Sequence, residues 1–484
     1  MRNPLDAVIG WINPAAGVRR AQQRKNLERA YEAASRKDPW RPRRAGASAN
    51  ADHQADASTL RAKSRSLRQN VAYINAGMNA RTHHGVGTGI TSQFTTPALQ
   101  AAWLQFVDEC DADGNTNLYG LQKLAWDTMD TDGEVLFRIR PRRPSDGFKI
   151  PFQLQAMEVD WLDTTRTRNP DNGNAVIEGI EYDLLGRKVN YWFWSQHPGD
   201  VTLRTAFKME SKPVPAEQVI HLFSCDRPGQ GRGFPRMASI IARTRDFSLY
   251  EDAERARKNL ETRLSVLASA SVDGLEQPDK TPGDVADLGT LGSGGIISLP
   301  AGLNLTAVEP KPAAGYVETA KLELHLIAAG AGFTYEHATG DMSESNFTQG
   351  RMRTLAFRRE IEQVQWITFI PGLLDRICRE FVSYGALAGL WKAEVPWKVK
   401  HTTPRWEYIQ PDQEVAADLK EIGSGLATIS SKLRARGEDP EDVFTEWKKD
   451  RDRLVADGTW EDMLFLTRGN LPTAPAQPDP GAKP

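Results

Sequence analysis

Residues 219–270 read VIHLFSCDRPGQGRGFPRMASIIARTRDFSLYEDAERARKNLETRLSVLASA, and this stretch decides the fold. Apolar and polar side chains alternate over residues 219–223, which predicts a short strand. The Gly- and Pro-rich residues 228–233 predict a turn. Pro235 then favours the first turn of a helix, where its missing N–H does no harm. A helix over residues 235–270 would be about 54 Å long at ~1.5 Å per residue, far above the average for a globular protein.

The two halves of this predicted helix differ in character. The first half has one apolar face, made by Met237, Ile240, Ile241, Thr244 and Phe247. The second half is charged nearly all round, through Glu251, Glu254, Arg255, Arg257, Lys258, Glu261 and Arg263. Such a helix is either solvated or packed against copies of itself through charge pairs. On this stretch alone, a surface helix of an ordinary domain fits equally well.

The composition is that of a globular protein of several domains. The chain has 484 residues, of which 40% are hydrophobic and 26% charged, and this length allows two to four domains. No apolar run approaches about 18 residues, so no membrane span is expected, and the N-terminus lacks a signal-peptide pattern. The three cysteines, Cys110, Cys225 and Cys378, lie far apart, which argues against a disulfide framework or a zinc site and fits a reducing compartment.

Charge is distributed unevenly along the chain. Residues 1–70 hold 15 Lys and Arg against 6 Asp and Glu, a balance of +9, and the net charge of −2 therefore leaves −11 for the remainder. Because affinity for duplex DNA comes mostly from neutralised phosphates, the acidic body is not expected to hold DNA tightly. The basic leading arm, residues 1–59, is expected to be flexible and solvated.

Folded structure is expected to begin near residue 60, with a helix over residues 60–78. The glycines at 85, 87 and 89 are too closely spaced for a dinucleotide fingerprint and predict a turn. Residues 109–114 resemble the start of a calcium loop, but Gly120 stands where a bidentate Glu is required. We therefore expect a polar turn that caps a helix over residues 118–129.

Residues 133–223 are rich in predicted strands. Alternating patterns occur at residues 135–140 and 152–156, and a hairpin is expected across residues 180–193. The aromatic run at residues 191–194 could stack on nucleic-acid bases, but strand cores use the same residue types, and the core interpretation is favoured.

After the long helix, residues 272–295 predict a loop or a small module, and residues 296–299 and 303–308 a short hairpin. A helix is expected over residues 316–329, followed by a loop over residues 330–346. This loop holds the group of side chains most like an active site: Tyr335, Glu336, His337, Asp341 and Glu344. One histidine and three carboxylates could hold a metal, although they lack the fixed spacing of a metal-binding helix and a second nearby histidine.

A second long helix is expected from Asn346, whose spacing to Gln349 is that of a capping box, to about residue 384. Its predicted packing face consists of Ile367, Ile370, Leu374, Ile377 and Phe381. Pro371 lies inside this pattern and should kink the helix, because proline removes a backbone hydrogen bond.

The C-terminal part is expected to be extended over residues 397–409, with helices at residues 411–422 and 440–455. Asp439 should cap the latter helix, with Phe444, Trp447 and Leu454 facing inward. Residues 471–484 predict a disordered tail.

The sequence carries none of the common catalytic motifs. A phosphate-binding G-x-x-x-x-G-K-[ST] loop, a G-x-S-x-G elbow and an H-E-x-x-H metal motif are all missing from it. We therefore expect no ATP hydrolysis, no cofactor and no metal. If the chain handles DNA, another protein must supply the energy.

Several motifs resemble those of the lambda family of tailed-phage portal proteins. The resemblance rests first on the turn made by Arg227, Pro228, Gly229, Gln230, Arg232 and Gly233, before a long helix. It is supported by the R-S-L-x-x-N run at residues 65–70 and by V-G-x-G-I at residues 86–90. A third motif is matched by Gly332, Tyr335, Glu336, Thr339, Gly340, Asp341, Asn346, Phe347 and Thr348. As a whole, the resemblance covers roughly residues 60–460, with its motifs in the expected order and at the expected separations.

This resemblance implies an α+β fold with long stem helices, a kinked wing helix, a small mixed or antiparallel β wing and a small β-containing clip. It divides the chain into an arm (1–59), wing (60–234), stem helix (235–270), clip (271–314), second stem helix (315–331), tunnel loop (332–346), wing with the kinked helix (347–400), crown (401–467) and tail (468–484). The charged residues 251–263 then become candidates for the channel, and the side chains from Tyr335 to Glu344 candidates for the tunnel loop.

The resemblance also implies a function. About twelve copies would form a ring at one capsid vertex, through which double-stranded DNA is packaged and later ejected. The implied partners are the large subunit of the terminase motor, head–tail adaptor proteins, and the major capsid or scaffold protein. The protein would belong to the virion and assemble in the host cytoplasm. A duplex that slides through a channel needs spaced charges of both signs, because a uniformly basic channel wall would bind it tightly. The mixed charges at residues 251–263 meet that need.

Two other functions are compatible with parts of the sequence. A metal-dependent phosphoesterase or nuclease could use Glu336, His337, Asp341 and Glu344. A monomeric DNA-binding adaptor is the other possibility, and its mass in solution would distinguish it from a ring.

Overall fold

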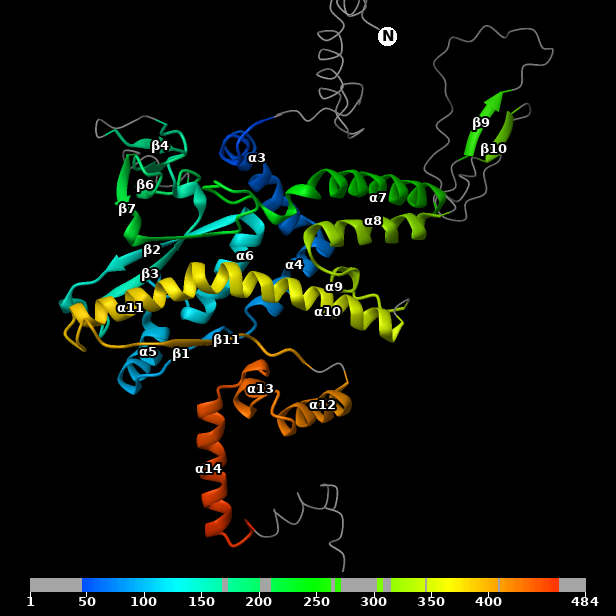
Figure 1. Ribbon diagram of the computed structural model, residues 1–484. Coiled ribbons are helices and arrows are strands. Elements are labelled where there is room, and N and C mark those ends of the chain that lie inside the picture. Colours follow the sequence, from blue (N-terminus) through cyan, green and yellow to red (C-terminus); the bar gives the residue numbers. More distant parts are fainter. Residues whose placement is uncertain are drawn as a thin grey trace, which may run out of the picture.

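The computed structural model describes residues 46–167, 173–200, 210–262, 266–270, 303–307, 315–343, 346–407 and 410–460. It is an α+β protein in which helices outnumber strands and the strands form small separate sheets (Figure 1). The helices are α3 (Ala49–Asn70), α4 (Ala72–Gly85), α5 (Pro97–Glu109), α6 (Leu118–Asp132), α7 (Ile241–Thr262), α8 (Tyr316–Ala331), α9 (Tyr335–Thr339), α10 (Phe347–Val364), α11 (Asp375–Leu387), α12 (Pro411–Gly423), α13 (Ile429–Ala435) and α14 (Pro440–Ala456). A π-helical segment, η6 (Gln365–Leu374), joins α10 to α11, and short 3₁₀ turns include η4 (Ala216–Gln218) and η5 (Arg236–Ser239).

The strands form four antiparallel groups. The central sheet has the order β3 (Phe152–Met157), β2 (Glu134–Pro141), β8 (Val219–Phe223), and a second sheet runs β4 (Ala175–Ile177), β5 (Ile180–Tyr182), β6 (Lys188–Trp194), β7 (Ser211–Pro215). Two strand pairs lie apart from these: β1 (Thr91–Phe94) with β11 (Val399–Thr402), and β9 (Val266–Ala270) with β10 (Leu303–Ala307). The predicted strands at 135–140, 152–156 and 219–223 and the hairpin between β5 and β6 are confirmed.

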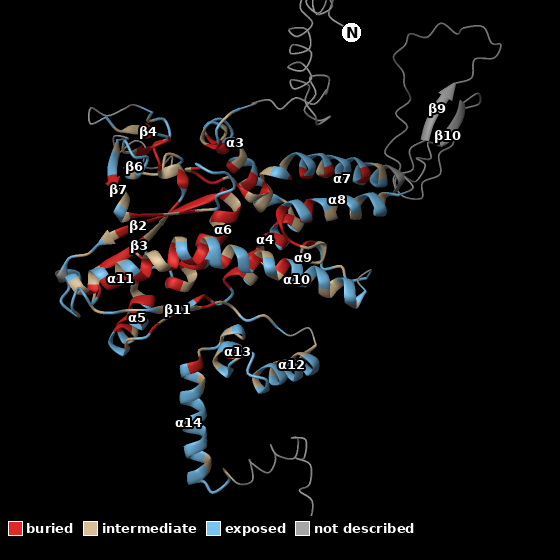
Figure 2. Ribbon diagram, in the orientation of Figure 1, coloured by how far each residue is buried: buried red, intermediate tan, exposed pale blue. Residues whose placement is uncertain are grey.

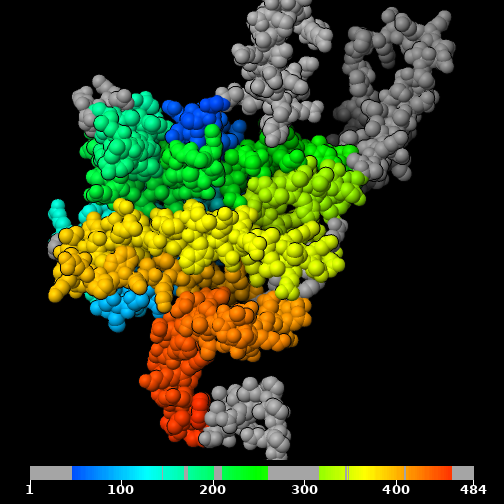
Figure 3. All heavy atoms as spheres, in the orientation of Figure 1, coloured from blue at the N-terminus to red at the C-terminus, as the bar shows by residue number. Residues whose placement is uncertain are grey.

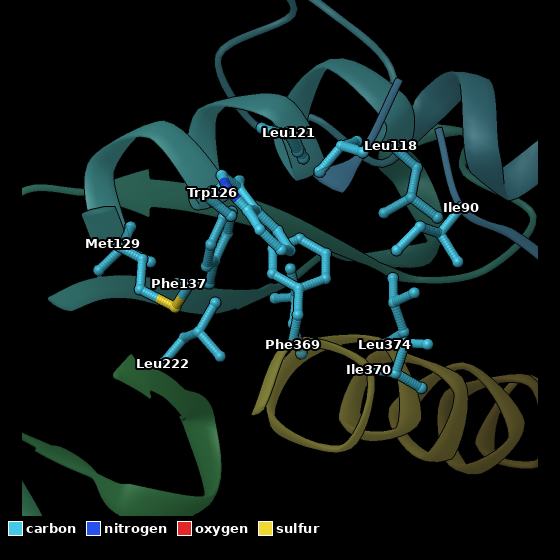
Figure 4. Packing of buried hydrophobic residues seen from close by; sticks show 14 of the residues in the cluster. Ile90, Leu118, Leu121, Trp126, Met129, Phe137, Leu222, Phe369, Ile370 and Leu374 are labelled. Atoms are coloured by element: carbon cyan, nitrogen blue, oxygen red, sulfur yellow. The ribbon is translucent and has the colours of Figure 1, made fainter. Parts of the chain in front are cut away.

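The main core lies where α6, the central sheet and η6 meet (Figure 4). Trp126 of α6 packs on Phe369 of η6, with ring centroids 5.2 Å apart. Such aromatic pairs contribute about 0.5–1.5 kcal/mol beyond the area that they bury. A smaller core fills the space between the two sheets and includes Leu136, Tyr191 and Phe193. This confirms the core interpretation for Tyr191 and Phe193, whereas Trp192 and Trp194 are only partly buried.

Local sequence explains where α6 begins and ends. The side chain of Asn117 accepts hydrogen bonds from the backbone N–H groups of Tyr119 and Gly120, and so caps the first turn. The helix stops at Gly133, which has φ +93°. A Cβ atom there would lie 2.3 Å from the backbone carbon of Phe234, so only glycine fits. The carboxylate of Asp111 accepts from three backbone N–H groups of the preceding loop, which confirms a polar turn there.

Three expectations about the N-terminal half are wrong. The expected start of folded structure near residue 60 is wrong, since helix α3 already begins at Ala49, where Ser48 caps it and His53 is buried against the body. The predicted helix 60–78 is two helices that meet at Val71, whose backbone is extended. The predicted 36-residue stem helix is shorter: η5 precedes α7, which ends at Thr262, and β9 follows it.

The prediction of a β-containing element after the stem is confirmed in part. The strand at residues 303–307 exists, but its partner is β9, which the sequence analysis assigned to the stem helix. Residues 296–299, the partner expected from the sequence, lie outside the described part of the chain. Val266 is a β-branched residue of the kind that strands favour, but the helical pattern of the preceding residues led the sequence analysis to extend the helix over it.

The second long helix runs continuously from α10 through η6 to α11 (Figure 1). Its buried face repeats every four residues through Phe357, Ile361, Gln365, Phe369, Leu373, Ile377 and Phe381. In a regular α-helix, with about 3.6 residues per turn, every such step would rotate the face by about 40°. The wider turns of η6 reduce this drift, and they leave Ile367 largely exposed, contrary to the predicted packing face.

The last described helix, α14, projects away from the rest of the chain (Figure 2). Asp439 caps α14 through the backbone N–H of Glu441, as predicted. The expectation that Phe444 and Trp447 face inward is wrong, since Trp447 is 52% exposed and the two rings pack mainly on each other. Within the described residues, α14 has only α13 as a close neighbour among the helices, and α13 itself was not predicted from the sequence.

Candidate functional site

The motif turn at residues 227–233 is held in shape by the side chain of Gln230. Its amide oxygen accepts from the backbone N–H groups of Asp226 and Arg227, at 2.9 and 3.1 Å. Its amide nitrogen donates to the carbonyl oxygen of Arg232 at 2.7 Å. Gly229 has φ +78°, a conformation that favours glycine. Pro228 precedes it, so Pro–Gly forms the tip of the turn.

The motif turn is also fastened to the first described helix, α3. Asn50 donates to the carbonyl oxygen of Gly229 and accepts from the N–H of Gly231, at 3.1 and 2.8 Å. Arg227 forms an ion pair with Asp52 at 2.9 Å. The turn and the start of α3, distant in sequence, therefore form one unit.

A cluster of buried charges lies directly beneath this turn. Arg232 donates to both carboxylate oxygens of Glu134, at 2.7 and 2.8 Å. His221 contacts the same carboxylate at 2.8 Å. His53 of α3 contacts Glu178 at 2.9 Å and lies 3.5 Å from Glu134. We call these five residues the Glu134 cluster.

The protonation states in this cluster follow from burial and from the neighbouring charges. Burial alone would raise the pKa of Glu134, but Arg232 and the hydrogen bonds from both histidines hold that pKa well below its usual range. Burial, assisted by the charge of Lys188, lowers the pKa of His221 to about 4. Burial acts in the same direction on His53, but hydrogen bonds to Glu134 and Glu178 outweigh it and raise its pKa. The cluster is thus a structural clamp that fixes α3, β2 and the motif turn.

A second buried network holds the base of the two helices α7 and α8. Arg81 of α4 is fully buried and contacts Asp130 at 2.9 Å, Glu360 at 3.0 Å and the carbonyl oxygen of Gly332 at 2.6 Å. Arg236, just before α7, also pairs with Glu360 and donates to the carbonyl oxygen of Ala331 at 3.0 Å. The end of α8 and the start of α7 are therefore anchored to the same three helices, α4, α6 and α10.

The helices α7 and α8 lie side by side and extend beyond the body (Figures 1 and 3). Arg243 of α7 pairs with Glu323 of α8 at 2.6 Å, and Tyr250 packs near Tyr316 with ring centroids 5.8 Å apart. The predicted stem helices thus form an antiparallel hairpin, although the first one is shorter than expected.

The charged residues of α7 are mostly balanced within the helix. Glu254 pairs with Arg257, and Arg255 lies 3.3 Å from Asp252 and 3.9 Å from Glu251. Lys258 is exposed. The side chain of Glu261 and all of Arg263 lie outside the described residues, so neither can be placed.

Apolar side chains on this hairpin lack a cover in the single chain. Leu249 is 62% exposed and Leu322 58% exposed, and Tyr250, Val317 and Leu326 are also exposed. Leu322 and Leu326 lie one turn apart on α8, so their side chains share an exposed face of that helix. Exposed apolar side chains grouped in this way mark an interaction surface.

The loop at residues 332–346 contains a helical turn, α9, which the sequence analysis did not predict. Its candidate residues have local partners: Tyr335 donates to Asp341 at 3.1 Å and stacks on His325, and Glu336 pairs with Arg353. His337 contacts the hydroxyl of Thr334 at 3.2 Å. Glu344 lies outside the described residues. The described members of the group do not converge on one point.

Within the described residues, one group could bring three possible metal ligands within 4.8 Å: Glu158, Asp160 and His197. Arg65 already contacts both carboxylates, at 3.2 and 2.7 Å, and Arg61 contacts Asp160 at 3.0 Å. Two guanidinium groups thus supply the positive charge that a cation would bring. This group differs from the set expected from the sequence around His337.

Pro371, the predicted kink, lies in η6, where the chain forms wider turns. A hollow of about 750 Å³ opens between η6 and β8, lined among others by Phe223, Ile367 and Pro371. This hollow and the exposed Ile367 form a second surface without a cover in the single chain.

Sequence reasoning missed most residues of the two buried networks. It recognised Arg232 as part of a motif but did not identify its partner Glu134, nor His53, His221 or Arg81. One signal was available, because Glu134 begins a strand next to Val135 and Leu136, where an unpaired carboxylate would be costly. None of the described helices is both long and apolar enough to cross a membrane.

Comparisons with known proteins complete this description. The family model described as "Phage portal protein, lambda family" matches residues 34–365. The "Probable portal protein" of Halomonas phage phiHAP-1 is 26% identical over 352 residues, which cover 70% of this chain and 67% of that protein.

Similar solved structures come from phage-like particles. The neck of a native gene transfer agent particle, computed with C12 symmetry, has 16% identity and a TM-score of 0.46, covering 78% of this chain and 94% of that chain. A chain from the virion of a native gene transfer agent particle has 14% identity and a TM-score of 0.47, and the match covers 80% of this chain and 94% of that chain. An HK97-family phage portal protein from Corynebacterium diphtheriae has 11% identity and a TM-score of 0.33, and the match covers 72% of this chain and 98% of that chain.

Proposed function

The chain belongs to the lambda family of phage portal proteins, and from this premise we infer how its parts form a channel for packaging and ejecting double-stranded DNA. The observation that carries the inference is the family match, which spans most of the chain. Portal proteins are structural proteins, and we further propose that this one has no enzymatic activity of its own.

We assign the antiparallel hairpin of α7 and α8 to the stem, the part that surrounds the DNA. The exposed Leu249, Val317 and Leu322 support this assignment, because side-by-side copies would cover them. Residues 241–262 carry five Lys and Arg and five Asp and Glu, so the helix is neutral overall. A neutral lining with charges of both signs keeps contacts with phosphates weak and lets a duplex slide. Glu251, Glu254, Arg255, Arg257 and Lys258 remain our channel candidates.

The remaining parts are assigned by family resemblance. The segment with β9 and β10 is the proposed clip, which would receive the terminase large subunit and later the head–tail adaptors. Residues 332–346, with Tyr335, Glu336, His337 and Asp341, are the proposed tunnel loop, and α12–α14 the crown. The outer wing would meet the major capsid or scaffold protein. These roles place the protein in the virion, at one capsid vertex, after assembly in the host cytoplasm, with no bound cofactor.

Electron microscopy of the purified protein tests the ring directly. We expect negative-stain images of rings with a central opening, and symmetry analysis should give twelve copies, the number that the resemblance implies. Solitary compact particles under conditions that favour association would contradict the proposal and favour a monomeric adaptor.

A nuclease assay tests the enzymatic alternative. Duplex DNA incubated with the protein and Mg²⁺ or Mn²⁺ should remain intact, since Glu336 and Asp341 are each bound to other side chains. Reproducible cleavage that His337→Ala abolishes would establish the metal-dependent phosphoesterase instead.

A further inference from the structure

A row of arginines lies on one face of β2, outside both networks described above. Arg138 and Arg140 alternate with the buried Phe137 and Ile139, and Arg142 continues the row past the end of the strand. Because side chains at i and i+2 share a face, the three guanidinium groups lie on the side opposite the main core. The second sheet covers the beginning of this face, at Leu136, but the core that it forms there does not reach the arginines.

The arginine row lacks acidic partners within the described residues. The structure records no ion pair for Arg138, Arg140 or Arg142 there, whereas Arg81 and Arg232 each have at least one. The Nε atom of Arg138 is buried without any hydrogen-bond partner. Burial first, and then the charge of the next arginine in the row, lowers the pKa of Arg138 and of Arg140. Among the described residues, the charge of Asp113 acts on the pKa of Arg140 in the opposite direction, so the repulsion among the three like charges is only partly offset.

Glutamines on the neighbouring strand β3 hold two of these guanidinium groups in place. Gln155 accepts from Nε and Nη2 of Arg140, at 2.8 and 2.5 Å, and Gln153 accepts from Nε of Arg142 at 2.9 Å. Gln153 is itself fixed, because it donates to the carbonyl oxygens of Glu109 and Asp111, at 2.7 and 3.0 Å. A neutral amide orients a guanidinium without cancelling its charge, so further N–H donors stay available to an anion.

We propose that this arginine row binds the phosphodiester backbone of double-stranded DNA. Successive side chains on one face of a strand are about 7 Å apart, at ~3.4 Å per residue, so the row offers evenly spaced charges. A nucleic-acid backbone matches even spacing for any sequence, and arginine is well suited to phosphate. An acidic peptide added as a strand would need the free edge of β3, but Ala112 already donates to Leu154 there.

This surface is distinct from the proposed channel. The hairpin α7–α8 and the β2–β3 ribbon lie at opposite sides of the body (Figure 1). The proposed contact is therefore with DNA outside the channel, and it depends on neither the ring nor the stem assignment. Three phosphate contacts give weak, salt-dependent binding, which agrees with an acidic body that does not hold DNA tightly.

Salt-dependent binding of a labelled duplex to the full chain tests the proposal. The variant Arg138→Gln/Arg140→Gln/Arg142→Gln should bind more weakly at low salt. The slope of log K against log salt should fall in magnitude by about 2.7, at ~0.9 per phosphate contact. Between about 50 and 200 mM salt, the wild type would then lose roughly 40-fold more affinity than the variant. The basic arm is unchanged in both proteins and cancels in the comparison.

The matched control removes three positive charges elsewhere, through Lys448→Gln/Lys449→Gln/Arg453→Gln on the exposed face of α14. It should leave the slope near that of the wild type, and equal losses in both variants would overturn the proposal. Gln155→Met keeps all charges but frees Arg140, and it should weaken binding. A poly-glutamate peptide that competes better than duplex DNA at equal charge would assign the row to an acidic protein instead. Circular dichroism melting confirms that each variant is folded.

Discussion

Arg232 and Glu134 form a bidentate ion pair in which both side chains are almost completely buried. The pair joins the motif turn to the first residue of β2, and His53 brings α3 to the same carboxylate. The motif turn therefore has a structural role in this molecule, because it holds α3 and β2 together. Its glycines and Gln230 shape the backbone so that Arg232 can reach the carboxylate.

The first prediction concerns this pair. Glu134→Gln removes the negative charge and leaves Arg232 buried without compensation, which should cost about 3–5 kcal/mol of unfolding free energy. Urea unfolding of the purified protein measures the loss, and hydrogen exchange should show faster exchange in α3. Asp452→Asn, at an exposed ion pair with Arg451, should change the midpoint little. An unchanged midpoint for Glu134→Gln would mean that the pair does not clamp the fold.

The second prediction concerns acid sensitivity near the proposed tunnel loop. His84 lies between Trp406 and His337, with ring centroids 5.5 Å from each. Burial, and then the charge on His337, lowers the pKa of His84 to about 4. Between pH 6.5 and 4 the unfolded chain therefore binds a proton that the folded chain does not, so this contribution to stability is lost as pH falls.

His84→Phe should remove that loss, because phenylalanine keeps the ring packing without a titratable nitrogen. Melting temperatures measured from pH 7 to about pH 4 should fall less steeply for the variant than for the wild type. His83→Gln, at the exposed neighbouring position, should follow the wild-type curve. If His84→Phe also follows that curve, His84 does not titrate as the structure indicates.

The helical and strand patterns predicted much of the fold because they depend on local spacing. The strands of the central sheet, α6 and α14 with its cap, and the second long helix are all confirmed. The expectations that were wrong concern segments whose structure depends on contacts with residues far away in the sequence. The end of α7 could not be predicted, because residues 266–270 become a strand only by pairing with residues 303–307. Similarly, α3 begins as early as Ala49 because His53 forms hydrogen bonds with Glu178 and with the carbonyl oxygen of Gly233, both far away in the sequence.

The site was less predictable than the fold. The motif turn and the charged helix could be predicted from the sequence. The buried partners of Arg232 and Arg81 come from four different segments of the chain, and the spacing of residues within one segment does not reveal them. The exposed rings of Phe444 and Trp447 on α14 show a second limit of prediction from the sequence. A helical pattern tells which side chains share a face, but it does not tell whether that face is covered by this chain or by another.

The third prediction tests the stem interface. Leu322→Asp places a charge on an exposed position of α8, so the stability of the single chain should change by less than about 0.5 kcal/mol. If neighbouring copies cover Leu322, the buried charge should prevent ring closure. Sedimentation and negative-stain images measure the assembled fraction. Leu184→Asp, at a highly exposed turn of the second sheet, is the matched control and should assemble normally. Rings formed equally by both variants would remove α8 from the interface.

The fourth prediction concerns Pro371, which lies in η6 with its ring exposed. Proline cannot donate a backbone hydrogen bond, so it favours the wider turns of this segment. Those turns keep Phe369, Leu373 and Ile377 on one face with Phe357. Pro371→Ala restores the donor and should relax η6 toward a regular α-helix. The exposed Ile367 and the hollow beside it should then shift, while the buried core keeps the single chain folded.

Pro371→Ala should therefore reduce ring assembly and the titre of infectious particles far more than it changes the melting temperature of the monomer. Gln363→Ala, at an exposed position two residues before η6, is the control, and it should leave both quantities near the wild type. Complementation of a portal-deficient phage measures the titre, and sedimentation measures assembly. A normal titre with Pro371→Ala would show that the backbone at this position has no part in contacts between copies. A large drop in monomer stability would instead make Pro371 a determinant of the core.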